Sequence, residues 1–191
     1  MVIAIEGLAG VGKTTLAESL AKELGFEYVK FPLGNLMGLD SENGRNALIN
    51  IVKHNNKFIT AWFLALNDIC VIEKYRDKDI VVDRFLLTNY FWNHDESTDD
   101  VFKLCFSSVK KPDIVILLTA SKETRIKRLQ GRNPNDMNLT HEGSLNADDS
   151  KFITLLHELK CKHEIIDVNS MDKAEVLEYV MSIIKNHRPK A

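Results

Sequence analysis

Cysteine is scarce in this chain of 191 residues, and long apolar runs are absent from it. The three cysteines, Cys70, Cys105 and Cys161, are odd in number and far apart, so we expect free thiols, partly in the core, and a reducing compartment. No apolar run approaches the roughly 20 residues that a membrane span needs. Because a strand is expected from residue 2 onward, no room is left for a signal peptide, and we expect a cytoplasmic protein.

An excess of charge of one sign is also missing. The 25 basic and 27 acidic residues leave a formal net charge of −2 at pH 7. A dedicated binder of nucleic acid or of membrane surfaces carries a clear positive excess, so we expect neither nucleic acid nor a membrane among the partners. The chain is 45% hydrophobic, as globular proteins are, and no linker divides it. We therefore expect residues 1–191 to form a single domain.

What the sequence does contain is an alternation of short apolar runs and longer helical patterns. The expected strands are 2–5, 26–31, 79–83, 113–118 and 164–168. The expected helices are 13–24, 41–53, 57–76, 97–109, 121–132, 148–160 and 171–186. This order predicts an α/β fold in which a parallel sheet is covered by helices on both faces. The polar stretch 131–149, rich in helix breakers, is expected to be a mobile lid.

Three of the nine glycines lie in "GLAGVGKT", residues 7–14, between the first expected strand and the first expected helix. The spacing G-x-x-x-x-G-K-[ST] is that of a phosphate-binding loop, whose glycines let the backbone N–H groups turn inward around an anion. Lys13 supplies a positive charge for the β- and γ-phosphates of ATP, and the hydroxyl of Thr14 can hold Mg²⁺. The predicted nucleotide-binding residues of this loop are Gly7, Gly10, Val11, Gly12, Lys13, Thr14 and Thr15.

Two further motifs carry groups that phosphoryl transfer needs. "VVDRF", residues 81–85, places Asp83 and Arg84 at the carboxyl end of a strand, where open α/β sheets bind ligands. Asp83 can act on the metal ion or as a base, and Arg84 can hold the acceptor. "RIKRLQGR", residues 125–132, leads an arginine-rich helix into the expected lid, so we expect Arg132 to bind phosphate. A base-reading GTPase would need an N-K-x-D stretch, which the sequence lacks.

Across nearly its whole length the chain resembles the thymidylate kinase-like branch of the P-loop nucleotide kinases. The resemblance rests on "IEGLAGVGKTTLAESLAKEL", "KFP", "VVDRF" followed by Thr88, "KPDIVILL", "KRLQGR" and "IIDV". It implies the P-loop NTPase three-layer sandwich, with a five-stranded parallel sheet, helices on both faces and a lid. It further implies that Arg128 lies against the adenine of ATP, that Arg132 reaches its phosphates, and that the enzyme is a homodimer.

The sequence departs from the family where the acceptor binds. Ala9 stands where the family usually has Asp or Glu, and "FPLGN" lacks the arginine expected after the F-P step. Asp68 stands where an arginine normally faces thymine. A carboxylate accepts hydrogen bonds from amino groups, so Asp68 favours a cytosine- or adenine-type base, unless it is an ordinary solvated helix residue. The predicted acceptor-binding residues are Phe31, Phe63, Asp68, Arg84, Thr88 and Trp92, although the aromatic ones can equally belong to the core.

These motifs predict an ATP- and Mg²⁺-dependent kinase acting on a nucleoside monophosphate, with an acceptor other than strictly dTMP. Its catalytic residues are Lys13, Asp83, Arg84 and Arg132, and its metal ligands are Thr14 and Asp83. Two alternatives stay open. One is a (deoxy)nucleoside kinase acting on a 5′-hydroxyl, and the other is a regulatory P-loop ATPase.

Overall fold

The structure, a computed structural model, describes residues 1–30, 50, 56–140 and 142–187. Five parallel strands form one sheet in the order β2-β3-β1-β4-β5. The strands are β1 (Val2–Glu6), β2 (Glu27–Lys30), β3 (Ile80–Asp83), β4 (Ile114–Thr119) and β5 (His163–Asp167). The predicted five-stranded parallel sheet is therefore confirmed.

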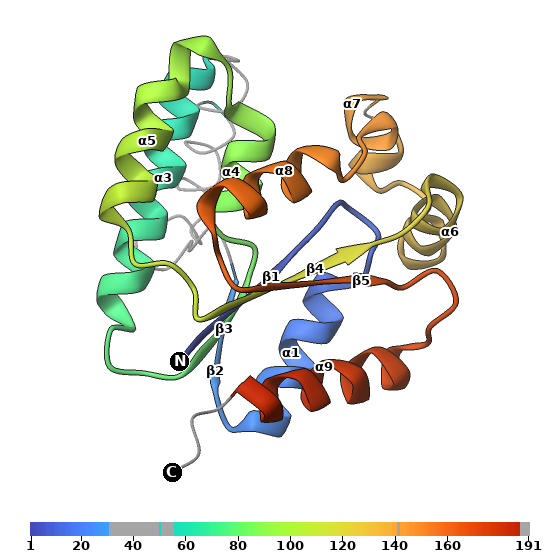
Figure 1. The fold of residues 1–191 in the computed structure, drawn as a ribbon. Helices are drawn as coiled ribbons and strands as arrows, with labels where there is room; N and C mark the ends of the chain where they lie inside the picture. Colours follow the sequence, from blue (N-terminus) through green and yellow to red (C-terminus); the bar gives the residue numbers. More distant parts are fainter. Residues whose placement is uncertain (31–49, 51–55, 141, 188–191) are drawn as a thin grey trace.

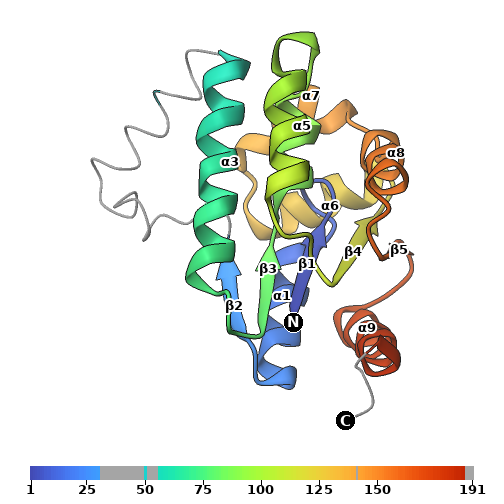
Figure 2. The same ribbon diagram turned by 60° about the vertical axis from the view of Figure 1, so that its left-hand side comes forward.

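Helices cover both faces of this sheet, as the alternation predicted (Figure 1). They are α1 (Lys13–Leu24), α3 (Lys57–Lys74), α4 (Leu86–Asn93), α5 (Asp99–Ser108), α6 (Lys122–Arg132), α7 (Glu142–Asn146), α8 (Ser150–Leu159) and α9 (Lys173–His187), with 3₁₀ turns η2 (Glu96–Thr98) and η3 (Met137–Leu139). Helices α1 and α9 lie on one face, and α3, α4, α5 and α8 lie on the other. Figure 2 shows α3 and α5 side by side from a second direction.

The three inner strands of the sheet, β3, β1 and β4, determine where the predicted phosphate-binding motifs lie. All residues of β1 and β3 are buried, because helices cover both faces of these strands. Ile5 pairs in register with Asp83, and Glu6 pairs with Leu117. The carboxyl ends of β1, β3 and β4 therefore meet at one edge of the sheet, where the phosphate-loop motif and the D-R motif begin.

Most expected elements match the observed ones to within a few residues. The predicted helix 41–53 and Phe31 lie outside the described residues, apart from residue 50. Sequence patterns missed α4, because its first four residues are all buried and therefore show no helical alternation. They also missed α7 and η3, which lie inside the stretch expected to be a loop-like lid.

The structure also bears on two other expectations, the free cysteine thiols and the absence of membrane-spanning segments. Cys105 and Cys161 are buried in the core and Cys70 is half-buried, and all three thiols are free. Among the described helices, none combines the length and the apolar character that crossing a bilayer requires.

Candidate active site

The loop between β1 and α1 needs its glycines for two separate close contacts. Gly7, at φ +133°, would place a Cβ atom 2.3 Å from the carbonyl oxygen of Leu118, the next-to-last residue of β4. Gly10, at φ +89°, would place one 2.7 Å from the carbonyl oxygen of Arg125 on α6. Any side chain at these positions would push the loop away from β4 or α6, so both glycines set its shape.

A cavity of about 630 Å³ opens over this loop. It is lined by Ala9, Gly10, Val11, Gly12, Lys13, Thr14, Thr15, Leu16, Arg84, Leu118, Arg128, Leu129, Gly131, Arg132, Asn138, Val168, Met171, Asp172, Lys173 and Val176. Its volume lies within the range of small-molecule sites. Both cationic and apolar side chains line the cavity. It can therefore bind a phosphate chain together with a flat apolar base. The predicted loop residues other than Gly7 line it, and Gly7 packs against the main chain of β4.

Lys13 lies at the base of the cavity and is almost fully buried. Its Nζ donates to the carbonyl oxygen of Leu8 at 2.6 Å. Burial, and then the positive charge of Arg84, lowers the pKa of Lys13 well below its usual value. An anion bound beside Lys13 would counter both effects, because it replaces lost solvation and offsets the like charge of Arg84.

Thr14 and Asp83 stand side by side, as the metal-site prediction requires. Thr14 Oγ1 donates to Asp83 Oδ2 at 2.6 Å, and the hydroxyl of Tyr28 donates to the same oxygen at 3.3 Å. Asp83 Oδ1 is buried and has no hydrogen-bond partner within the described part of the chain. A carboxylate oxygen without a donor beside a hydroxyl is a donor set that Mg²⁺ prefers, so these residues fit the metal ion of a P-loop enzyme.

Arg84 enters the cavity from the turn after β3, with an unusual backbone conformation. Its φ is +74°, in the left-handed region that costs a non-glycine residue about 1–3 kcal/mol. Its main-chain N–H donates to the carbonyl oxygen of Ile5 at 3.0 Å, which fixes the turn against β1. The charge of Arg84 acts on both Lys13 and Glu6.

Two arginines of α6 reach the same cavity. Arg128 donates to the carbonyl oxygens of Val11 at 3.2 Å and Val168 at 2.7 Å, and thereby joins the phosphate loop to the segment after β5. Arg132 forms an ion pair with Asp136. The main-chain N–H of Asn138 and then the guanidinium of Arg132 lower the pKa of Asp136 to about 2.

The residues predicted to bind the acceptor are more scattered. Among those that the structure describes, Arg84 alone lines the nucleotide cavity. Phe63 is half-buried beside the exposed face of α3, and Trp92 is partly exposed with its ring edge-on to Phe91. Their contact with a base stays a prediction.

Asp68 is fully buried, so the alternative that it is a solvated helix residue is wrong. Neither of its carboxyl oxygens has a hydrogen-bond partner among the residues described. Burial, and then the charge of Glu6, raises the pKa of Asp68 well above its usual range.

Glu6 is a site residue that the sequence reasoning missed. Its Oε1 accepts from the main-chain N–H groups of Phe85 at 2.9 Å and Thr88 at 3.3 Å, and Oε2 accepts from Thr88 Oγ1 at 2.5 Å. Burial raises its pKa to about 7 against the lowering effect of these donors and of Arg84. The sequence feature that could have indicated Glu6 is its place: it is an acidic residue at the end of a buried strand, directly before the glycine loop.

Comparisons with known proteins agree with this geometry. The family model of an AAA domain matches residues 3–151. A probable thymidylate kinase of Saccharolobus solfataricus is 31% identical over 193 residues, which cover 97% of each chain. One from Methanocaldococcus jannaschii is 27% identical over 190 residues, covering 97% of this chain and 96% of the relative. Among solved structures, a deoxyadenosine kinase from M. mycoides with bound dATP superposes with a TM-score of 0.71 at 20% identity, covering 97% of this chain and 100% of its own.

The raised pKa of Glu6 predicts a pH-dependent stability. Because the folded protein holds the Glu6 proton up to a pH of about 7, against 4.5 for an ordinary glutamate, its free energy of unfolding should fall as pH rises through that interval. Denaturant titrations should show the wild type losing about 3 kcal/mol relative to Glu6→Gln across it. The exposed Glu23→Gln on α1 is the control, and a constant difference between wild type and Glu6→Gln would contradict the prediction.

Proposed function

Because the chain belongs to the thymidylate kinase-like family of P-loop kinases, we propose that it transfers the γ-phosphoryl group of ATP to a nucleoside monophosphate. The general activity of this family is phosphoryl transfer to a nucleotide or nucleoside. The observation that carries the proposal is the cavity over the glycine loop. Lys13, Arg84 and Arg132 converge there beside the paired Thr14 and Asp83.

Each of these groups acts on charge that develops during transfer. The loop N–H groups and Lys13 hold the β- and γ-phosphates, and Lys13 exchanges its bond to Leu8 for a phosphate oxygen. Arg84 holds the acceptor phosphate, and Arg132 neutralises the transferring group from the other side. Thr14 and Asp83 would hold Mg²⁺, which neutralises phosphate charge when it is bound.

A nucleoside kinase is the second candidate, and one observation favours it. Ala9 lines the cavity where the family usually places a carboxylate near the acceptor, so a group that holds a monophosphate acceptor is missing. The buried Glu6, whose pKa is raised to about 7, is a second carboxyl group at this edge of the sheet, besides Asp83, that could accept a proton from a hydroxyl near neutral pH. The likeness to the deoxyadenosine kinase structure is compatible with either acceptor.

A screen of ADP release with ATP and Mg²⁺ over nucleosides and nucleoside monophosphates tests the proposed reaction. We expect turnover that depends strictly on a nucleoside monophosphate. Lys13→Ala should lose at least ~100-fold in kcat/KM, because one preorganised electrostatic donor is removed. Lys22→Ala, an exposed lysine on the same helix, should keep wild-type activity.

Three results of this screen would contradict the proposal. Turnover with bare nucleosides alone would assign the nucleoside kinase. Steady ATP hydrolysis without any acceptor would assign a regulatory ATPase. Near-normal turnover by Lys13→Ala would remove the phosphate-loop mechanism altogether.

The base preference is expected to follow from Asp68. A buried carboxyl group without a donor is costly, and a ligand amino group at that point would satisfy it. We propose that cytidine- or adenosine-type acceptors exceed thymidine-type ones by tens-fold in kcat/KM, corresponding to ~1–3 kcal/mol. Asp68→Asn should narrow this gap, whereas the exposed Asp77→Asn should not. A wild-type preference for thymidylate would refute the assignment.

The α3 helix offers a surface for the expected homodimer. Its outer face exposes Phe58, Ile59, Trp62, Leu66 and Ile69. Apolar side chains contiguous on one helix are typical of an interface, and a two-fold axis would pair this face with itself. Light scattering should therefore give the mass of two chains, and Leu66→Glu should reduce it to one. Leu104→Glu, at a leucine on α5 that is 51% exposed against 48% for Leu66, should leave the dimer intact. A monomeric wild type would exclude this arrangement.

We also propose that 131–149 forms the lid of a single domain spanning 1–191. Arg132 and Asn138 of this stretch line the cavity. ATP bound there would therefore contact the stretch at both of these residues. Amide hydrogen exchange with and without nucleotide tests this. Exchange within 131–149 that is indifferent to nucleotide would exclude a lid.

A further inference from the structure

The segment from Ser144 to Lys151 touches the phosphate-loop side of the molecule at one end. The buried guanidinium of Arg125 on α6 donates to the carbonyl oxygens of Ser144 at 3.3 Å, Leu145 at 3.1 Å and Ala147 at 3.0 Å. These three bonds hold the end of α7 and the following turn against α6. Gly10 of the phosphate loop packs directly on the main chain of Arg125. Arg125 is therefore the single residue between the phosphate loop and the turn after α7.

Asp149 lies in the same segment, directly before α8. Its Oδ1 is buried and has no hydrogen-bond partner among the described residues. Burial raises the pKa of Asp149 to about 6, while the charges of Arg125 and Lys13 act in the opposite direction. The carboxyl group therefore lies within electrostatic reach of the lysine that is expected to bind phosphate, and any anion beside Lys13 changes its surroundings.

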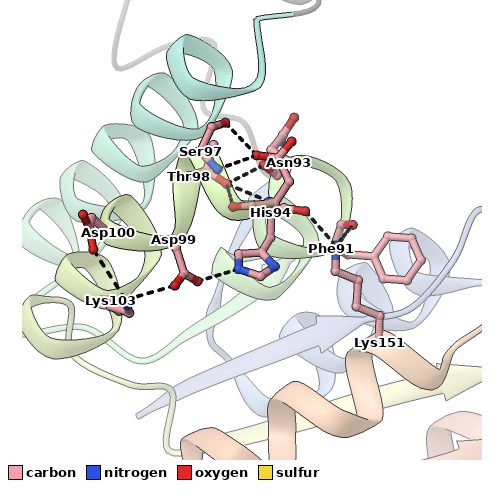
Figure 3. Close-up of polar contacts among 10 residues, drawn as sticks. Phe91, Asn93, His94, Ser97, Thr98, Asp99, Asp100, Lys103 and Lys151 are labelled. Atoms are coloured by element: carbon pink, nitrogen blue, oxygen red, sulfur yellow. Dashed lines mark hydrogen bonds and ion pairs between the residues drawn. The ribbon is translucent and has the colours of Figure 1, made fainter.

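Lys151 makes the contact at the other end. Its Nζ donates to the carbonyl oxygens of Phe91 at 2.9 Å and His94 at 3.3 Å, at the carboxyl end of α4 (Figure 3). It also lies 5.3 Å from the ring centre of Tyr90. An ammonium group at a helix C-terminus satisfies carbonyl groups that have no partner in the helix and opposes the helix dipole. The neighbouring Phe152 stacks on Phe91, with ring centres 4.4 Å apart.

Helix α4 belongs to the acceptor side. It begins two residues after Arg84, and its first turn carries Thr88, which donates to Glu6. Its other end is held by Lys151, by the hydroxyl of Thr98, which donates to the carbonyl oxygen of Asn93 at 3.0 Å, and through the 2.8 Å contact of His94 Nε2 with Asp99 Oδ1 on α5 (Figure 3). A shift of Lys151 would therefore move the carboxyl end of α4, and Trp92 with it.

We propose that Lys151 is a positioning residue that transmits nucleotide occupancy of the phosphate loop to α4, and so couples the ATP side of the site to the acceptor side. The path runs from the phosphate loop through the contact of Gly10 with Arg125, and along the segment that Arg125 holds, to the carbonyl groups of α4. The inference rests on the proposed function in one respect, namely that a nucleotide occupies the cavity over the loop. It does not depend on which acceptor the enzyme uses.

The two tryptophans allow this coupling to be measured directly. Trp62 lies on α3 and Trp92 on α4, so a Trp62→Phe parent reports the environment of α4 alone. The probe is the β,γ-imido analogue of ATP with Mg²⁺, and its affinity is measured separately by calorimetry. In the parent, the analogue should change the fluorescence of Trp92 with a midpoint equal to the calorimetric Kd.

Lys151→Met keeps the aliphatic stem and removes the charged donor. It should bind the analogue with an affinity within about twofold of the parent, while most of the Trp92 signal is lost, because the link between the two sites is broken. Lys151→Arg should restore most of the signal. Lys185→Met is the matched control, because Lys185 is an exposed lysine on α9, on the opposite face of the sheet from α4.

Four outcomes would overturn the inference. A full Trp92 signal in Lys151→Met, or analogue binding by the parent with no Trp92 signal, would exclude coupling through Lys151 and leave the proposed function standing. Absence of analogue binding in the parent would refute both. Hydrogen exchange in the wild type provides a measurement that needs no variant, and unchanged protection of α4 on analogue binding would likewise refute the coupling.

Discussion

The site depends on a constraint of space, the close approach of the glycine loop to two neighbouring elements at once. Gly7 lies against the end of β4, and Gly10 lies against the first turn of α6. A Cβ atom at either position would collide with main chain, which cannot rotate away as a side chain can. The loop is therefore held between β4 and α6, and its backbone can turn toward the cavity only because both positions lack side chains.

Buried charge is concentrated around this loop. Lys13, Asp83 and Glu6 are almost fully buried at the carboxyl edge of the sheet, and Asp68 on α3 is fully buried within reach of the charge of Glu6. Asp83 and Asp68 have oxygens that no described group satisfies, and Glu6 and Lys13 have strongly shifted pKa values. Such an arrangement is costly for a structural core and is typical of a ligand-binding site.

Helix α4 is held differently from the glycine loop. The phosphate loop and α6 supply most of the residues that line the cavity. Helix α4, to which we assign the acceptor, is tied to β1 through Glu6 and Thr88, to α5 through His94, and to α8 through Lys151. A helix of eight residues has little stability by itself, so its position follows the elements that hold its two ends.

Local pattern was enough to predict the parallel sheet, the glycine loop, the Thr14–Asp83 pair and the arginines of α6. Each depends on residues near in sequence, or on the rule that carboxyl ends of parallel strands meet at one edge. The role of Glu6, the burial of Asp68 and the contacts of Lys151 with α4 were decided by tertiary structure alone. Each of these depends on groups brought together from distant parts of the chain, such as Glu6 with Thr88 and Lys151 with Phe91. Desolvation and hydrogen bonding between such groups exist only after the helices pack on the sheet, so no periodicity within one segment can record them.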